Sequence, residues 1–159
     1  VMMLRGLSTA ALKETTRDIR YMPGAETLVR VMRDNGSFCV LVSGGFTCFT
    51  GPVAKELGFH ANHGNVLQIK DNSLTGLVEE PILDHQTKLS FLHHYAAEHK
   101  LMESDCLAVG DGANDLAMIS AAGLGVGFHP KAYLRERAQN SIVFGDLTAL
   151  LYIQGYSGF

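Results

Sequence analysis

The residues best suited to chemistry lie in one short string, CLAVGDGAND, at residues 106–115. An apolar run ends at a glycine, and Asp111, Asn114 and Asp115 then follow close together. This pattern predicts a buried strand that stops at an acidic loop, followed by a helix beginning near Asn114. Carboxylate oxygens at such a loop are ligands that Mg²⁺ prefers. A loop in which Asn114 or Asp115 only caps the helix is the alternative interpretation.

A second candidate is the string LVSGGF at residues 41–46. A hydroxyl at a strand end, followed by glycines that open a helix, offers a side-chain donor and several backbone N–H groups to a phosphate. A plain turn capped by Ser43 is the alternative. Lys88 alone is typical of a solvated surface charge. A phosphate beside carboxylates nevertheless requires a fixed cation, because the like charges would otherwise repel. We therefore take Ser43, Gly44 and Lys88 as candidate phosphate-binding residues.

The elements that must position these residues follow from hydrophobic periodicity. Helices are predicted over 8–19, 23–34, 46–57, 84–100, 114–122, 131–139 and 146–152, and strands over 38–43, 106–110, 124–128 and 141–144. The unbroken apolar run at 38–43 is typical of a strand buried on both faces. Segments 65–70 and 74–78 alternate around Asp71-Asn72 and predict a β-hairpin. Strands alternating with helices indicate an α/β fold with a doubly wound parallel sheet, whose carboxyl edge binds ligands.

Composition limits the classes of partner. The 159 residues suit one domain, and a net charge of −3 gives no general attraction to nucleic acid or anionic membranes. We find no apolar segment long enough to span a membrane and no signal-peptide pattern. Cys39 and Cys106 stand in apolar runs and are expected to be buried and reduced, which favours a cytoplasmic protein. The seven histidines form no metal-ligand pattern and are expected to be surface or packing residues.

Three features follow one another along the chain: a hydroxyl after an apolar strand, a helical lysine, and the string G-D-G-x-N-D. This order resembles the pattern of the haloacid dehalogenase (HAD) superfamily of phosphotransferases. Further strings narrow the resemblance to its phosphoserine phosphatase branch: LVSGGF at 41–46, LTG at 74–76, PILD at 81–84, VGDGAND at 109–115 and DLTALLY at 146–152. The resemblance covers the chain from Arg5 onward. It implies a Rossmann-like core over 23–159, with the hairpin as a small insertion and 1–22 as the remainder of a helical cap.

The branch implies Mg²⁺-dependent hydrolysis of O-phospho-L-serine to L-serine and phosphate, a step of serine biosynthesis, through an aspartyl-phosphate. By this resemblance Asp111 is a Mg²⁺ ligand. Lys88 is catalytic because it pairs with phosphate and nucleophile, and Asp115 because it holds the acidic loop and metal shell in place. The substrate- and phosphate-binding residues implied are Ser43, Gly44, Lys88 and Asn114.

The chain departs from the family at its expected start. The family opens with a strand ending in D-x-D-x-[ST], whose first aspartate is the nucleophile and whose second is the general acid and base. None of the eight aspartates of this chain stands in such a string, so the chain contains no nucleophile. We expect a carboxyl-terminal part of a longer enzyme, with the N-terminal central strand and most of the cap absent.

The lost strand is expected between the strands at 38–43 and 106–110. Its absence would leave unpaired backbone groups on both sides. We expect the 159 residues alone to be inactive, and either poorly stable or paired with the N-terminal segment or a strand-donating partner. Two alternatives stay open. One is a nucleophile-less module that binds phosphate and Mg²⁺, and the other is a phosphatase of another small phosphomonoester, such as phosphohomoserine.

Overall fold

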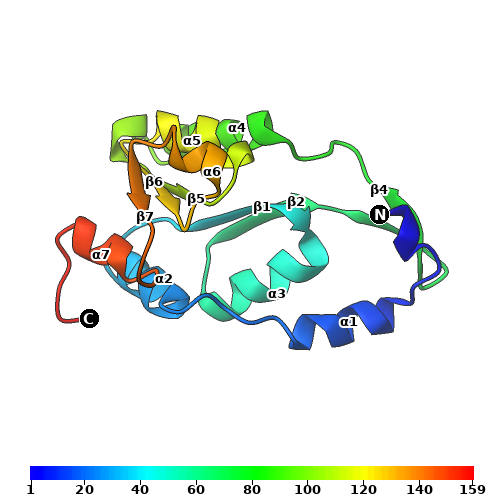
Figure 1. Cartoon of the computed structure of the whole chain (residues 1–159). Coiled ribbons are helices and arrows are strands. Elements are labelled where there is room, and N and C mark those ends of the chain that lie inside the picture. The colour runs from blue at the N-terminus through cyan, green and yellow to red at the C-terminus, as the bar shows by residue number, and fades with distance from the viewer. The chain divides into compact units, whose positions relative to one another are not determined.

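The computed structural model describes residues 1–159, in which helices alternate with strands (Figure 1). The α-helices are α1 (Thr9–Arg17), α2 (Ala25–Asp34), α3 (Thr47–Leu57), α4 (His85–Glu98), α5 (Leu116–Ala121), α6 (Ala132–Arg135) and α7 (Ala149–Ile153). The strands are β1 (Val40–Phe46), β2 (Ala61–Asn65), β3 (Leu67–Lys70), β4 (Ser73–Val78), β5 (Leu107–Gly110), β6 (Leu124–Phe128) and β7 (Asn140–Ile142). Short 3-10 helices are η1 (Met2–Leu4), η2 (Glu103–Asp105) and η3 (Ala113–Asp115).

The chain divides into two compact units. Unit 1 comprises Val1–Ile82 with Asp146–Phe159, and unit 2 comprises Leu83–Gly145. Parallel strand pairs flanked by helices occur in both units, which confirms the predicted α/β class. The strands are divided among three sheets, ordered β1–β2, β3–β4 and β5–β6–β7. That a strand is missing between β1 and β5 stays a prediction.

The predicted β-hairpin is confirmed in unit 1. Strands β3 and β4 pair antiparallel, and both turn residues are left-handed, with φ +51° at Asp71 and +58° at Asn72. Short-chain Asp and Asn tolerate this region, which the tight hairpin turn requires. Leu67 and Leu74 of the hairpin are buried against Leu12 of α1. This apolar cluster therefore joins the first helix to the hairpin.

Local signals define the helix ends in unit 1. The Ser8 hydroxyl caps α1 by accepting from the Ala11 amide at 3.2 Å. Gly36 after α2 and Gly58 after α3 are left-handed, which confirms both predicted helix ends. Along α2 the buried face includes Val29 and Val31.

Strand β1 differs from its prediction in two ways. It continues through Gly44 and Gly45 to Phe46, because pairing with β2 resumes at Phe46↔Asn65 after an irregularity that begins beyond Val42. The glycines therefore bend the ladder rather than end it. The residues of β1 are half-buried or exposed, so burial on both faces was wrong. Its partner β2 was not predicted, because its sequence ANHGN has neither alternation nor an apolar run.

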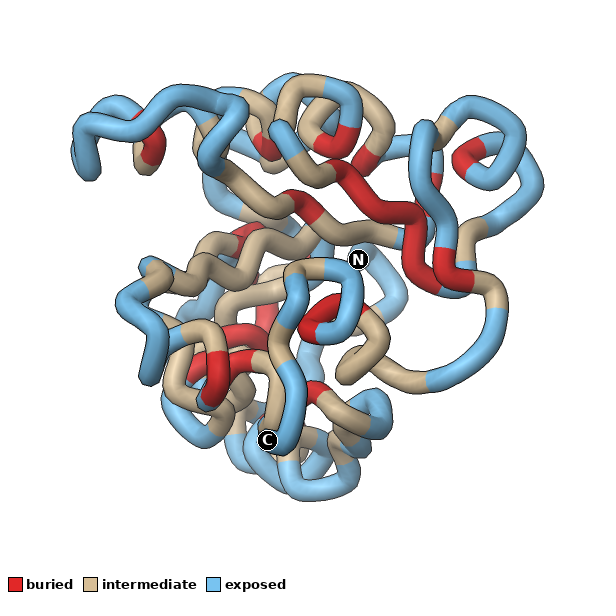
Figure 2. The backbone as a smooth tube through the Cα atoms, turned by 90° about the vertical axis from the view of Figure 1, so that its left-hand side faces the viewer, coloured by how far each residue is buried: buried red, intermediate tan, exposed pale blue.

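Unit 2 is a helix-covered parallel sheet. Its strands follow the order β5–β6–β7 with an unbroken register, from Leu107↔Leu124 to Gly110↔Gly127 in the first pair. Helix α5 packs on β5 and β6, and α4 packs on α5 (Figure 1). Ala108, Ile119 and Leu134 form a buried cluster. Figure 2 shows that buried residues fall in short runs between half-buried and exposed ones.

All three α-helices of unit 2 are shorter than predicted, although α4 lacks only residues at its two ends. The segment 114–122 begins with the 3-10 turn η3 before α5. The predicted helix 131–139 is reduced to α6, because Asn140 already pairs with Val126 in β7 and the chain must leave the helix to reach it. In the C-terminal part of unit 1, the Asp146 carboxylate accepts hydrogen bonds from the amide and the hydroxyl of Thr148, the N-cap residue of α7.

The three cysteines are free and only half-buried, so full burial of Cys39 and Cys106 was wrong. Partial burial raises the pKa of both thiols. None of the helices is both long and apolar enough to cross a membrane.

Close backbone packing in unit 2 predicts the effect of one glycine substitution. A Cβ atom added to Gly125 in β6 would lie 1.8 Å from the carbonyl oxygen of Ile119 in α5. Gly125→Ala should therefore lower the free energy of unfolding by at least about 2 kcal/mol, because helix and sheet must separate. Urea denaturation measures the change.

The matched control is Gly51→Ala in α3, where an added Cβ meets no atom within 4 Å apart from those of the two neighbouring residues. It should change stability by less than about 1 kcal/mol, because the backbone entropy that alanine saves in a helix is opposed by the contact of its Cβ with the ring of Pro52, the next residue. Equal effects of the two variants would contradict the packing described for β6.

Candidate functional site

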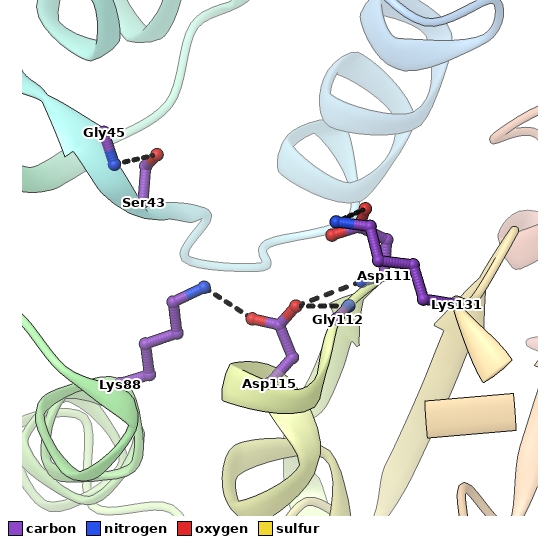
Figure 3. A network of polar contacts seen from close by, with 7 residues as sticks. All are labelled: Ser43, Gly45, Lys88, Asp111, Gly112, Asp115 and Lys131. Carbon is purple, nitrogen blue, oxygen red and sulfur yellow. Dashed lines mark hydrogen bonds and ion pairs between the residues drawn. The ribbon is translucent and has the colours of Figure 1, made fainter. Parts of the chain in front are cut away.

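The acidic loop after β5 is held by one of its own carboxylates. Oδ2 of Asp115 accepts hydrogen bonds from the backbone amides of Asp111 and Gly112, each at 3.1 Å (Figure 3). The side chain of Asp115 is only 5% exposed. Two charge-assisted bonds to consecutive amides fix the path of the chain where it leaves the sheet. The alternative that Asp115 merely caps α5 is not supported, because its side chain makes no cap bond to that helix.

Gly110, the last residue of β5, makes this closure sterically possible. A Cβ atom at Gly110 would lie 2.3 Å from Cγ of Asp115 and 2.5 Å from its Oδ2. No real Cβ approaches another atom so closely. The glycine that ends the predicted strand is therefore needed for the close approach of the Asp115 carboxylate.

The other oxygen of Asp115 bonds to Lys88. Nζ of Lys88 lies 2.5 Å from Oδ1 of Asp115, and the lysine side chain is only 9% exposed. Two opposite charges removed from water require such close pairing, because either one alone would be costly to bury. The common interpretation of a lone helical lysine as a solvated charge is wrong here. The structure instead brings Lys88 to the acidic loop.

Helix α4, which carries Lys88, begins at a capping box. Oδ1 of Asp84 accepts from the amide of Thr87 at 2.9 Å and from its hydroxyl at 2.8 Å, and that hydroxyl accepts from the Asp84 amide. These hydrogen bonds lower the pKa of Asp84 below its usual 3.8, and the bond from the Thr87 amide has the larger effect. The cap fixes the helix start one turn before Lys88.

Asp111 and Asn114 lie on the same loop, with side chains directed toward solvent. The Asp111 side chain is 62% exposed, and its Oδ2 lies 3.6 Å from Nζ of Lys131 (Figure 3). Asn114 is exposed as well. Both oxygens of Asp115 are already bonded, so Asp111 is the carboxylate of this loop that remains accessible to a cation.

The residues present fit Mg²⁺ as a partial shell. No group of three or more His, Cys, Asp or Glu side chains in the chain could hold a metal. Mg²⁺ typically uses one or two carboxylates and completes its octahedron with water and phosphate. An accessible Asp111 meets that requirement for one ligand. The donor chemistry therefore suits a metal that is shared with substrate and solvent.

In unit 1, Ser43 and Gly44 form a separate local feature. The Ser43 hydroxyl accepts from the Gly45 amide at 2.9 Å, which leaves its own proton available to donate (Figure 3). The Gly44 carbonyl accepts from the Asn65 side-chain amide at 2.8 Å. No side chain caps the N-terminus of α3, which follows directly. A hydroxyl donor and uncapped helix amides are the groups that bind phosphate.

The predicted residues thus divide between the two units. In unit 2 the structure brings together Lys88, Asp115 and Asp111, and Asn114 lies on the same loop. The sequence analysis missed Lys131, whose signal was its place three residues after β6, the strand that neighbours β5 in the sheet. The chemical roles of these residues stay predictions.

Comparison with known proteins agrees with the resemblance seen in the sequence. The family model of the haloacid dehalogenase-like hydrolases matches residues 1–120. A phosphoserine phosphatase of Streptomyces coelicolor is 39% identical over 155 residues, which cover 98% of this chain and 38% of that protein. The chain thus spans about two fifths of the length of this relative.

Solved structures are similar over almost the whole chain. The unliganded form of a probable phosphoserine phosphatase from Vibrio cholerae has a TM-score of 0.92 at 32% identity, covering 97% of this chain and 48% of that one. A phospho-aspartyl intermediate analogue of phosphoserine phosphatase has a TM-score of 0.90 at 32% identity, covering 96% and 73%. The similarity supports the α/β fold in both units.

Removing one partner of the buried pair should be costly. Asp115→Asn should lower the free energy of unfolding by about 3–5 kcal/mol, because Lys88 stays buried without its counter-charge. Adding Lys88→Met should recover part of that loss, since the unpaired charge is removed as well. Urea denaturation of the single and double variants measures both effects.

The control is Asp34→Asn, which removes the exposed pair with Arg30, whose atoms lie 3.7 Å apart. It should change stability by about 0.5 kcal/mol or less, because solvent screens such pairs. A loss for Asp115→Asn no larger than for Asp34→Asn would show that the buried pair carries no such energy.

The cap of α4 predicts a pH dependence. The pKa of Asp84 is lowered in the folded state, so its contribution to stability is complete above about pH 4 and is lost as the pH falls through the folded value. Asp84→Asn keeps an effective N-cap but cannot titrate. The melting temperature of the variant should therefore fall less steeply than that of the parent below pH 4. An equal fall of the melting temperature with pH in the two proteins would contradict the cap as described.

Proposed function

Since the chain belongs to the family of haloacid dehalogenase-like hydrolases, we propose that it is part of a phosphoserine phosphatase. The reaction is the Mg²⁺-dependent hydrolysis of O-phospho-L-serine to L-serine and phosphate, a step of serine biosynthesis. The observation that carries this proposal is the network in unit 2, in which Asp115 joins the buried Lys88 to the loop bearing Asp111. The identity to phosphoserine phosphatases across nearly the whole chain supports the choice of substrate.

The proposed chemistry is a two-step phosphoryl transfer. A carboxylate attacks phosphorus, the bond from phosphorus to the seryl oxygen breaks, and that oxygen takes a proton to release serine. Water then cleaves the aspartyl-phosphate and releases phosphate. We propose that the attacking aspartate belongs to a part of the protein outside these 159 residues, since none of their aspartates stands in a D-x-D-x-[ST] string. The similar structure described as a phospho-aspartyl intermediate analogue supports this route.

The residues of this chain contribute charge and positioning. Lys88 would stabilise the negative charge of the nucleophile and the phosphoryl group, with Asp115 holding its ammonium and the acidic loop in fixed positions. The Ser43 hydroxyl and the Gly44 backbone would bind phosphoryl oxygens, and Asn114 would contact the substrate. Asp111 would hold Mg²⁺, which supplies charge neutralisation on the transferring oxygens when bound.

Further proposals follow from the same resemblance. Residues 1–22 would be the remainder of the helical cap and 23–159 the core. The protein would act in the cytoplasm, in keeping with its free cysteines. The 159 residues alone would release no phosphate.

Phosphate release by the full-length protein tests the function. L-Phosphoserine and phosphohomoserine are supplied with and without Mg²⁺, beside the isolated 159 residues. We expect Mg²⁺-dependent release from phosphoserine by the full-length protein. Asp111→Asn should lower kcat by about 10²–10³-fold, the cost of one electrostatic stabiliser. The matched control is Asp18→Asn, an exposed aspartate of unit 1, which should leave the rate unchanged.

Each contrary result identifies an alternative. Faster release from phosphohomoserine would replace the substrate proposed here. Binding of Mg²⁺ and phosphate by the full-length protein without turnover would indicate a binding module. Phosphate release by the isolated 159 residues at the rate of the full-length protein would overturn the proposal that the nucleophile lies outside them.

A further inference from the structure

A second loop of unit 2 reaches the acidic loop and has no part in the mechanism above. Strands β5 and β6 are paired up to Gly110↔Gly127, so the chain after each strand emerges at the same edge of the sheet. The backbone amide of Lys131 donates to the carbonyl of Asp111 at 2.8 Å. The ammonium of Lys131 lies 3.6 Å from Oδ2 of the same residue. Lys131 therefore contacts Asp111 through both its backbone and its side chain.

The loop that carries Lys131 is held in a strained conformation. His129 has a φ of +42°, a region that residues other than glycine rarely adopt. Its amide donates to the Ile142 carbonyl at 2.8 Å. Its ring stacks on Phe128 with centroids 4.1 Å apart, and Nε2–H donates to the Gly145 carbonyl at 2.9 Å. These contacts maintain a costly backbone turn, and such strain concentrates at functional sites.

The two lysines near the acidic loop differ in what they can do. Lys88 is buried and bonded to Asp115 at 2.5 Å, so moving it away from Asp115 would leave a buried carboxylate without its counter-charge. The Lys131 side chain is 75% exposed and lies at a looser distance from Asp111. It can leave Asp111 at little cost, because water replaces the lost interaction. Of the two lysines only Lys131 is paired with Asp111, and it can exchange there with another cation.

We propose that Lys131 competes with Mg²⁺ for the carboxylate of Asp111 and so sets how tightly this site binds the metal. The inference rests on the proposed function, in which Asp111 is a metal ligand. The ammonium neutralises Asp111 when no metal is bound and must be displaced when a metal binds. The strained turn at His129 keeps the lysine beside the carboxylate. Lys131 is thus a tuning residue rather than one that touches the reacting atoms.

Mg²⁺ binding measured by calorimetry on the full-length protein, without substrate, tests the proposal. Lys131→Met removes the charge and keeps an apolar stem, whereas Lys131→Arg keeps the charge. Lys100→Met is the matched control, because it removes an exposed lysine that follows the C-terminal end of α4. Lys131→Met should lower the Kd for Mg²⁺ by about two- to fivefold, the size expected of an exposed ion pair.

Lys131→Arg and Lys100→Met should leave the Kd close to that of the parent. The difference between Lys131→Met and the parent should shrink as KCl is raised, since salt screens exposed charges. An unchanged or larger Kd for Lys131→Met, with Mg²⁺ still bound by the parent and not by Asp111→Asn, overturns the competition alone. No Mg²⁺ binding by the parent overturns it together with the metal role proposed for Asp111.

Discussion

The buried ion pair between Lys88 and Asp115 is the interaction on which the rest of unit 2 depends. A lysine and an aspartate can leave water only if each remains the partner of the other, so α4 and the loop after β5 must keep one relative position. The second oxygen of Asp115 accepts hydrogen bonds from two amides of the loop. The position of the ion pair therefore also fixes the backbone of the loop. Helix α4, strand β5 and the acidic loop that follows β5 are therefore held together as one rigid element.

Around this rigid centre the remaining charges are loose. Asp111 and Lys131 are exposed and 3.6 Å apart, so their interaction is weak and responds to solvent and salt. The contrast suits the proposed phosphoryl transfer, which needs charges held in fixed positions, and the proposed metal site, which needs a carboxylate that a cation can reach. One loop contains both kinds of group because burial changes abruptly along it, from exposed Asp111 to buried Asp115.

Much of this could be read from the sequence, because the deciding signals are local. Turn residues such as Asp71 and Asn72 require left-handed conformations, and G-D-G-x-N-D combines a chain reversal with carboxylates. Signals that depend on distant residues were lost. The burial of Lys88 is decided by Asp115, 27 positions away. Strand β2 has a polar sequence and exists because β1 pairs with it. Lys131 reaches Asp111 only through the register of β5 with β6.

The contact between Gly110 and Asp115 has an evolutionary consequence. No side chain fits at residue 110 while a carboxylate occupies its place at 115, and a glycine at 110 without that carboxylate would leave two amides of the loop without their acceptor. Neither position can change by itself without a cost, so descendants of this sequence should keep the two residues or replace both. Gly110 and Asp115 should therefore be conserved or replaced together. A relative that lacks both residues should have a different backbone conformation in this loop.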